Sequence, residues 1–174
     1  MNERYDYRSD PALGPVLAYW QAKRGCRSMP SRSDIDPIEV PSLLPHLQLI
    51  DIVDDRFRFR LIGSELVYAF GRDYTGFYVD ELFDGPREIN VTEVYRAVRE
   101  RRQPAFMRSQ YFTTKDIDLV ANRLYLPLST NDRDVNMILG AMTFEYGSDL
   151  SISGIWGKSA RLTGSKLEFV DSAV

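Results

Sequence analysis

The apolar residues near the start of the chain recur with a helical period. Leu13, Val16, Leu17 and Trp20 stand at i, i+3, i+4 and i+7, so on a helix they form one apolar stripe. An aspartate and a proline precede the stripe and a glycine follows it, as is typical of helix ends. The pattern predicts an amphipathic N-terminal helix. Its stripe must cover either the sheet of its own domain or a second subunit.

From residue 47 the pattern changes to that of strands. Residues 47–53 are almost continuously apolar, and in residues 56–62 Phe and Leu alternate with three arginines. The first pattern is typical of a strand buried on both faces, and the second of a strand with one charged face. The arginines would protect an edge strand against aggregation, or they would pair with carboxylates on a neighbouring strand.

Helical patterns return in the middle of the chain before further strands. A short helix is predicted to begin at residue 36, another spans residues 64–70, and a longer one spans residues 87–102. Strand patterns follow at residues 106–113, 124–128 and 135–146. This order predicts an α+β domain in which helices lie on one face of an antiparallel sheet of about five strands.

The chain divides into three segments on these patterns. We expect the N-terminal helix and a linker in residues 1–30, the folded domain in residues 31–147 and a tail in residues 148–174. The tail is rich in Gly and Ser, with Leu150, Ile152, Ile155 and Trp156 as its only apolar anchors. It is either an arm for a partner or a segment that packs on the domain.

Composition narrows the choice of function. The chain has 174 residues, of which 44% are hydrophobic, enough for one sizeable core. A net charge of -3 gives no electrostatic reason to expect nucleic acid or an anionic membrane as partner. No apolar run approaches the roughly 20 residues that span a bilayer. The N-terminus lacks the pattern of a signal peptide and Cys26 is the only cysteine, so we expect a cytoplasmic location.

Several motifs resemble those of a family of bacterial single-domain PAS-like proteins. The similarity runs from the first predicted helix to the middle of the chain, and the later strands agree in order and length. The motifs are Tyr19-Trp20, Arg24-Gly25-Cys26-Arg27, Met29-Pro30-Ser31-Arg32, Asp36-Pro37, Leu43-Leu44-Pro45, Phe57-Arg58-Phe59-Arg60-Leu61-Ile62-Gly63 and Gly71-Arg72-Asp73-Tyr74-Thr75-Gly76. The resemblance implies a PAS-like fold more firmly than it implies a function.

The resemblance also implies where a ligand and a partner would bind. PAS folds enclose a cavity between sheet and helices, where many members hold a cofactor or metabolite, and they commonly dimerise through an N-terminal amphipathic helix. Homodimerisation would then use Leu13, Val16, Leu17 and Trp20. Candidate cavity residues are Tyr68, Tyr74, Phe83, Tyr95 and Tyr125, whose rings and hydroxyls could orient a ligand, although each also fits a plain core position.

Missing residues argue against the familiar cofactors of such proteins. A flavin–cysteine adduct needs a cysteine beside the flavin, yet residues 64–83 contain none, and a haem ligand is absent because residues 87–102 contain no histidine. His46 is the only histidine, and no carboxylate or thiolate flanks it at metal-ligand spacing. We therefore expect neither haem, nor a flavin adduct, nor a metal.

No catalytic arrangement is evident either. His46 has no nucleophile turn in its neighbourhood, and two carboxylate pairs, Asp116 with Asp118 and Asp132 with Asp134, fit solvated turns. We expect a non-catalytic sensory or signalling domain that binds a small molecule in its core, a separate signalling protein, or both. The alternative is a ligand-free adaptor for protein–protein interaction, and an enzyme of unknown reaction ranks third.

Overall fold

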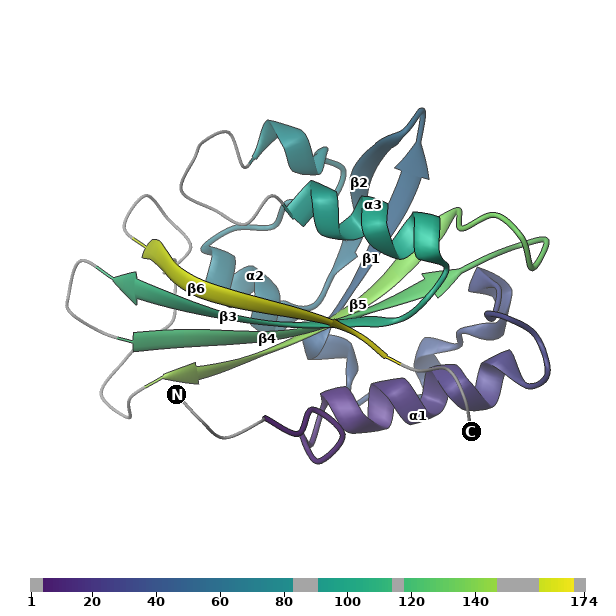
Figure 1. Ribbon diagram of the computed structural model, residues 1–174, viewed down its shortest axis with the longest axis horizontal. Helices are drawn as coiled ribbons and strands as arrows, with labels where there is room; N and C mark the ends of the chain where they lie inside the picture. Colours follow the sequence, from purple (N-terminus) through teal and green to yellow (C-terminus); the bar gives the residue numbers. More distant parts are fainter. Residues whose placement is uncertain (1–4, 83–90, 114–117, 147–159, 171–174) are drawn as a thin grey trace.

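A computed structural model describes residues 5–82, 91–113, 118–146 and 160–170. In this part of the chain six strands form one antiparallel sheet in the order β2-β1-β5-β4-β3-β6 (Figure 1). The strands are β1 (Leu47–Val53), β2 (Arg56–Ile62), β3 (Ala105–Thr113), β4 (Asp118–Leu128), β5 (Met137–Tyr146) and β6 (Ala160–Phe169). The α-helices are α1 (Leu13–Arg24), α2 (Ser64–Phe70) and α3 (Val91–Arg101). The α+β class and the antiparallel sheet are confirmed.

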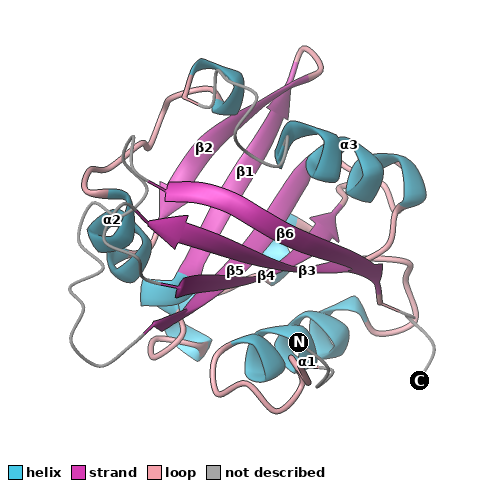
Figure 2. Ribbon diagram, turned by 60° about the vertical axis from the view of Figure 1, so that its left-hand side comes forward, coloured by secondary structure: helices cyan, strands magenta, loops and turns pink. Residues whose placement is uncertain are grey.

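The helix α1 lies on one face of the sheet and α3 on the opposite face (Figures 1 and 2). The whole predicted stripe of α1, Leu13, Val16, Leu17 and Trp20, is buried within the single chain. The Trp20 indole N–H donates to the Pro127 carbonyl of β4 at 2.9 Å. The stripe therefore covers the domain's own sheet, and these four side chains are not exposed to a second subunit. A homodimer stays a prediction, and it would need another surface.

The predicted cap of the first helix is present in a modified form. The Asp10 carboxylate accepts the Ala12 and Leu13 backbone N–H groups at 2.8 and 2.9 Å, and it also accepts the Thr143 hydroxyl of β5 at 2.9 Å. Asp10 thus accepts two backbone N–H groups at the start of the helix that would otherwise lack partners. Its bond to Thr143 also links the helix to the sheet.

The strand β2 lies at the edge of the sheet, as its alternating arginines predicted. Phe57 and Phe59 are buried, whereas Arg58 and Arg60 reach Asp51 on β1 at 3.1 and 3.5 Å. The edge position and the pairing with a carboxylate on the neighbouring strand are thus both present, whereas protection against aggregation stays a prediction.

The sixth strand comes from the segment that the sequence predicted as a tail. Residues 160–169 pair antiparallel with β3, and the Val170 N–H donates to the Pro104 carbonyl at 2.8 Å. Thr163, Gly164 and Ser165 weaken the apolar alternation, and the register shifts between Gln110 and Tyr111. The sheet therefore has six strands rather than five. The predicted apolar anchors at 150, 152, 155 and 156 lie outside the described residues.

The helix predicted to begin at residue 36 is replaced by two short 3-10 turns, at Pro37–Glu39 and Leu44–His46. Pro41 and Pro45 explain the difference, because proline has no N–H to continue a helical ladder.

Within the described residues, none of the helices has the length and apolar character that crossing a bilayer requires.

Candidate functional site

A row of polar side chains is buried on the sheet face that α3 covers. Strand pairing places Gln48 on β1, Arg123 and Tyr125 on β4, and Ser109 and Tyr111 on β3 toward this face. Each of the five is at most 4% exposed. We call these five residues the polar row. Because buried polar groups are costly unless they are hydrogen-bonded, a cluster of them inside a core requires an explanation.

Arg123 is the charged member of the polar row. Its guanidinium donates one hydrogen bond to the Ser109 hydroxyl and one to the Tyr111 hydroxyl, both at 2.8 Å. Burial opposes its charge, but the neighbouring Tyr111 and Tyr125 outweigh that effect and raise the pKa of Arg123. The row therefore contains a permanent cation in a region of low dielectric.

One buried hydroxyl of the row has no hydrogen-bond partner, that of Tyr125. Burial raises the pKa of Tyr95, and a hydrogen bond between the Gln48 and Tyr95 side chains offsets part of that shift. Burial also raises the pKa of Tyr125, so its phenol is neutral at physiological pH. The Tyr125 hydroxyl is thus available as a hydrogen-bond donor.

Gly140 of β5 lies between Gln48 and Tyr125 in the sheet. It pairs with Gln48 on one side and with Tyr125 on the other. A Cβ at position 140 would lie 2.6 Å from Gln48 Cγ and 2.7 Å from its Nε2. The missing side chain therefore allows the Gln48 amide to lie across β5, beside the Tyr125 position on β4.

Aromatic rings connect the polar row to α3 and to β2. The Tyr95 ring meets Tyr125 edge-on with centroids 5.3 Å apart, and it packs against Phe57 at the same distance. These contacts form a continuous path of three rings from β4 through α3 to β2.

The structure brings together two of the five predicted cavity residues, Tyr95 and Tyr125. Tyr68 does not lie with them, because it is 49% exposed on the side of α2 opposite to buried Leu66. Tyr74 belongs to a separate aromatic group, with its ring 6.1 Å from Phe70 and 6.2 Å from Phe77. Phe83 lies outside the described residues.

The sequence interpretation missed Gln48, Ser109, Tyr111 and Arg123. A signal was present, because Gln48 interrupts an apolar run and Arg123 occupies the register of Ala121 and Tyr125 in a buried strand. An arginine in the inward register of a central strand indicates either a structural network or a ligand contact.

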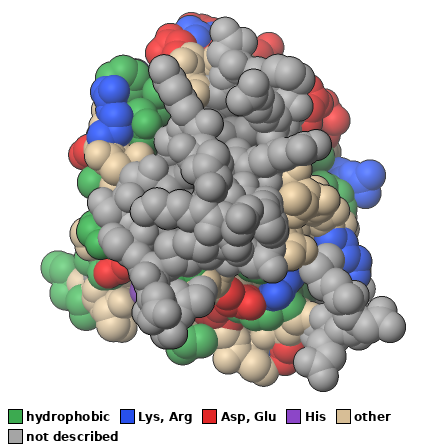
Figure 3. Space-filling view, turned by 90° about the vertical axis from the view of Figure 1, so that its left-hand side faces the viewer, with side chains coloured by type: hydrophobic (Ala, Val, Ile, Leu, Met, Phe, Trp, Pro, Cys, Tyr) green, Lys and Arg blue, Asp and Glu red, His purple; other side chains and the backbone are tan. Residues whose placement is uncertain are grey.

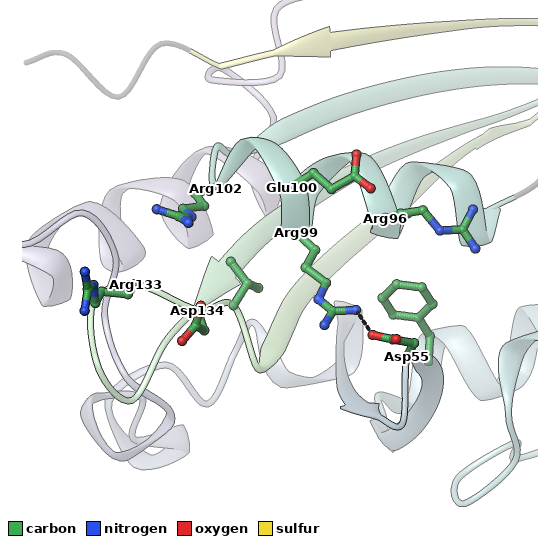
Figure 4. Close-up of a pocket in the computed structure, with 9 residues that line it drawn as sticks. Asp55, Arg96, Arg99, Glu100, Arg102, Arg133 and Asp134 are labelled. Carbon is green, nitrogen blue, oxygen red and sulfur yellow. Dashed lines mark hydrogen bonds and ion pairs between the residues drawn. The ribbon is translucent and has the colours of Figure 1, made fainter.

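A second feature is a pocket of about 530 Å³ at the C-terminal end of α3. It lies between α3, the β1–β2 turn and the β4–β5 loop (Figure 4). Its lining, which defines what we call the rim pocket, is Asp55, Phe57, Arg96, Arg99, Glu100, Arg102, Arg133, Asp134 and Val135. Phe57 therefore borders the rim pocket and also contacts Tyr95 of the interior.

At the opposite end of the molecule, the described basic and acidic side chains are interspersed around the margin of the view (Figure 3). His46 ends a 3-10 turn and Cys26 is exposed just after α1, so neither belongs to the polar row or to the rim pocket. The described residues contain no group of three metal-ligating side chains.

Comparisons with known proteins identify the family of this chain. A family model described as "PAS domain" matches residues 8–143. A Rhodobacter sphaeroides LOV protein is 12% identical, with a TM-score of 0.46 over 63% of this chain and 68% of that one. A light-oxygen-voltage domain studied with a flavin analogue is also 12% identical, with a TM-score of 0.47 over 64% of this chain and 84% of that one. No curated protein matches. Since the family model covers most of the sequence, the chain belongs to the PAS domain family.

Proposed function

We propose that this PAS domain is a sensory domain that binds a small molecule between its sheet and α3 and acts in trans on a separate signalling protein. The observation that carries the proposal is the Tyr125 hydroxyl, which is fully buried and has no hydrogen-bond partner. An unsatisfied buried hydroxyl costs about 1–3 kcal/mol, and a ligand that accepts its hydrogen bond would remove that cost.

The chemistry of the polar row suggests what the ligand presents. The Tyr125 hydroxyl is an available donor, and the cation of Arg123 lies in the same row. A carbonyl or carboxylate oxygen would satisfy these groups, while an apolar part would pack on Tyr95 and Met107. We therefore expect a small organic molecule with at least one exposed acceptor oxygen.

Relay of the signal would pass through α3. Its inner side carries Val94, Tyr95 and Val98, so a ligand that displaced the Tyr95 ring would move the helix or its outer surface. In this proposal the domain is non-catalytic, works in the cytoplasm and passes the change to a protein partner.

The proposal is tested by native mass spectrometry of the protein purified from its own host, followed by a thermal-shift screen of small carbonyl and carboxylate compounds. We expect a bound mass, or a compound that raises the melting temperature of the wild type. The matched pair of variants is Tyr125→Phe and Tyr146→Phe, since Tyr146 is partly exposed and lies outside the polar row.

Only Tyr125→Phe should lose the bound compound. If the wild type carries no compound, responds to none, and has an ordered water on the Tyr125 hydroxyl in a crystal structure, then the interior is purely structural. That result would favour a ligand-free adaptor.

A further inference from the structure

The rim pocket is a second candidate site, separate from the interior. We propose that it binds a small polyanion, by which we mean a molecule carrying two or more phosphate or carboxylate groups. The proposal does not depend on a ligand in the interior.

The charges that line the rim pocket support this class of ligand. Four arginines face three carboxylates there, although the whole chain is acidic with a net charge of -3. Arg99 pairs with Asp55 at 2.5 Å, and Arg96 pairs with Glu93 at 2.6 Å. Among the described residues Arg102 and Arg133 form no ion pair, and both side chains are exposed.

Two of the three carboxylates of the rim pocket already have partners. The Asp134 carboxylate accepts a hydrogen bond from the Asn131 side chain at 3.0 Å, and Asp55 pairs with Arg99 of the same pocket. Arg102 and Arg133 lie on the same side of the pocket, one from the end of α3 and the other from the β4–β5 loop (Figure 4). Two guanidinium forks from different elements match a ligand with two anionic groups.

A purely structural explanation accounts for only part of this arrangement. The last turn of a helix carries partial negative charge and favours arginine, which explains Arg99 and Arg102. It does not explain Arg133, which belongs to a loop. Arg102 also has a φ of 56°, a left-handed conformation that glycine usually takes at the end of a helix. An arginine in this strained position costs stability but keeps a guanidinium at the pocket.

The shape of the rim pocket favours a small molecule over a protein segment. Its volume of about 530 Å³ lies within the range of small-molecule sites. Phe57 and Val135, which are 2% and 5% exposed, form an apolar floor under the charged rim. The pocket therefore has room for one compact ligand, which the charged side chains of the rim would hold.

The test uses the full chain and two probes, pyrophosphate and citrate, titrated in low-salt chloride buffer and followed by NMR amide shifts and calorimetry. The variants are Arg102→Ala and Arg133→Ala, with Arg101→Ala as the control. Arg101 belongs to α3 but packs over the Phe169 ring outside the pocket. Arg101→Ala therefore changes the net charge by the same amount as the other two variants without touching the pocket. Tyr125→Phe serves as the control for the interior.

We expect saturable shifts at residues of the rim pocket for at least one probe. Arg102→Ala and Arg133→Ala should each weaken binding about tenfold, the loss expected of one charge-assisted contact. Arg101→Ala and Tyr125→Phe should each change it less than about twofold.

Two outcomes would overturn the proposal. One is an absence of saturable shifts in the pocket at about 10 mM of both probes, since this corresponds to less than about 3 kcal/mol of binding energy. The other is equal weakening by Arg101→Ala, which would indicate attraction to overall charge rather than a site.

Discussion

The polar row and the rim pocket both contain arginine, but they place it in opposite surroundings. Arg123 is 4% exposed and donates to two neutral hydroxyls, whereas Arg102 and Arg133 are exposed to solvent. Charge interactions are several-fold stronger in a protein interior than in water, and only the exposed ones are screened by salt. The same side chain therefore acts as a salt-insensitive hydrogen-bond donor in the interior and as a salt-sensitive positive charge at the surface.

The two regions are nevertheless neighbours, since only α3 and Phe57 lie between them. Tyr95 points from α3 into the interior, while Arg96 and Arg99 point from the same helix to the rim pocket. A variant on one side therefore has a natural control on the other.

The largest contrast should come from deleting one arginine in each region. Arg123→Ala would leave the Ser109 and Tyr111 hydroxyls without their donor and create a cavity, so we expect it to lower the free energy of unfolding by about 3 kcal/mol. Arg133→Ala should change it by less than about 0.5 kcal/mol. Urea denaturation followed by circular dichroism measures both, and similar values for the two variants would contradict the contrast.

Alkaline pH should weaken the interior specifically. Burial raises the pKa of Tyr95 and of Tyr125 above the usual value of 10.0, so the folded protein keeps these phenols neutral while the unfolded chain ionises them. Stability is therefore unaffected below about pH 10 and falls above it, by up to about 1.4 kcal/mol per pH unit for each tyrosine.

Denaturation curves between about pH 9 and 11.5 test this expectation. Tyr125→Phe should make the decline shallower, and Tyr146→Phe should make less difference because Tyr146 is partly exposed. A decline of equal steepness in wild type and Tyr125→Phe would contradict the raised pKa of Tyr125.

The same tyrosine-to-phenylalanine change at two positions of the polar row should change the free energy of unfolding in opposite directions. Tyr111→Phe removes the acceptor of an Arg123 hydrogen bond and should destabilise the protein by about 1 kcal/mol. Tyr125→Phe removes a hydroxyl that has no partner, so in ligand-free protein it should stabilise by about 1 kcal/mol. Chemical denaturation of the two variants decides, and a loss of stability in Tyr125→Phe would mean that its hydroxyl is satisfied.

The smallest effect is expected at the Arg99–Asp55 pair beside the rim pocket. The Asp55 side chain is 83% exposed, and exposed ion pairs contribute at most about 1 kcal/mol to the free energy of unfolding. Arg99→Ala should lower the free energy of unfolding by about 0.5 kcal/mol or less, and about 0.5 M salt should remove the difference from wild type. A salt-independent loss would indicate that Arg99 contributes through packing instead.

Local patterns predicted most of the sheet and little of the site. The alternation in β2 identified an edge strand, because period and charge are properties of neighbouring residues. In β6 the alternation is weak, and its pairing with β3 is what defines the strand. The stripe of α1 had two possible partners in sequence, and only the packing of Trp20 on β4 distinguishes them.

The polar row could not be predicted for a related reason. Gln48 and Tyr125 are far apart in the chain, and they flank the same glycine only because β5 lies between β1 and β4. Taken singly, each is a polar residue in an apolar strand. Their meaning depends on the strand order, which no short segment of the sequence contains.

The close fit between Gly140 and Gln48 has a consequence for how this sequence can evolve. A side chain at 140 would occupy the space of the Gln48 amide, so position 140 cannot gain one while Gln48 keeps its place. Relatives that carry alanine or serine at 140 should therefore carry a shorter residue at 48. Covariation of this pair across homologues would show whether the buried amide is kept wherever the glycine is kept.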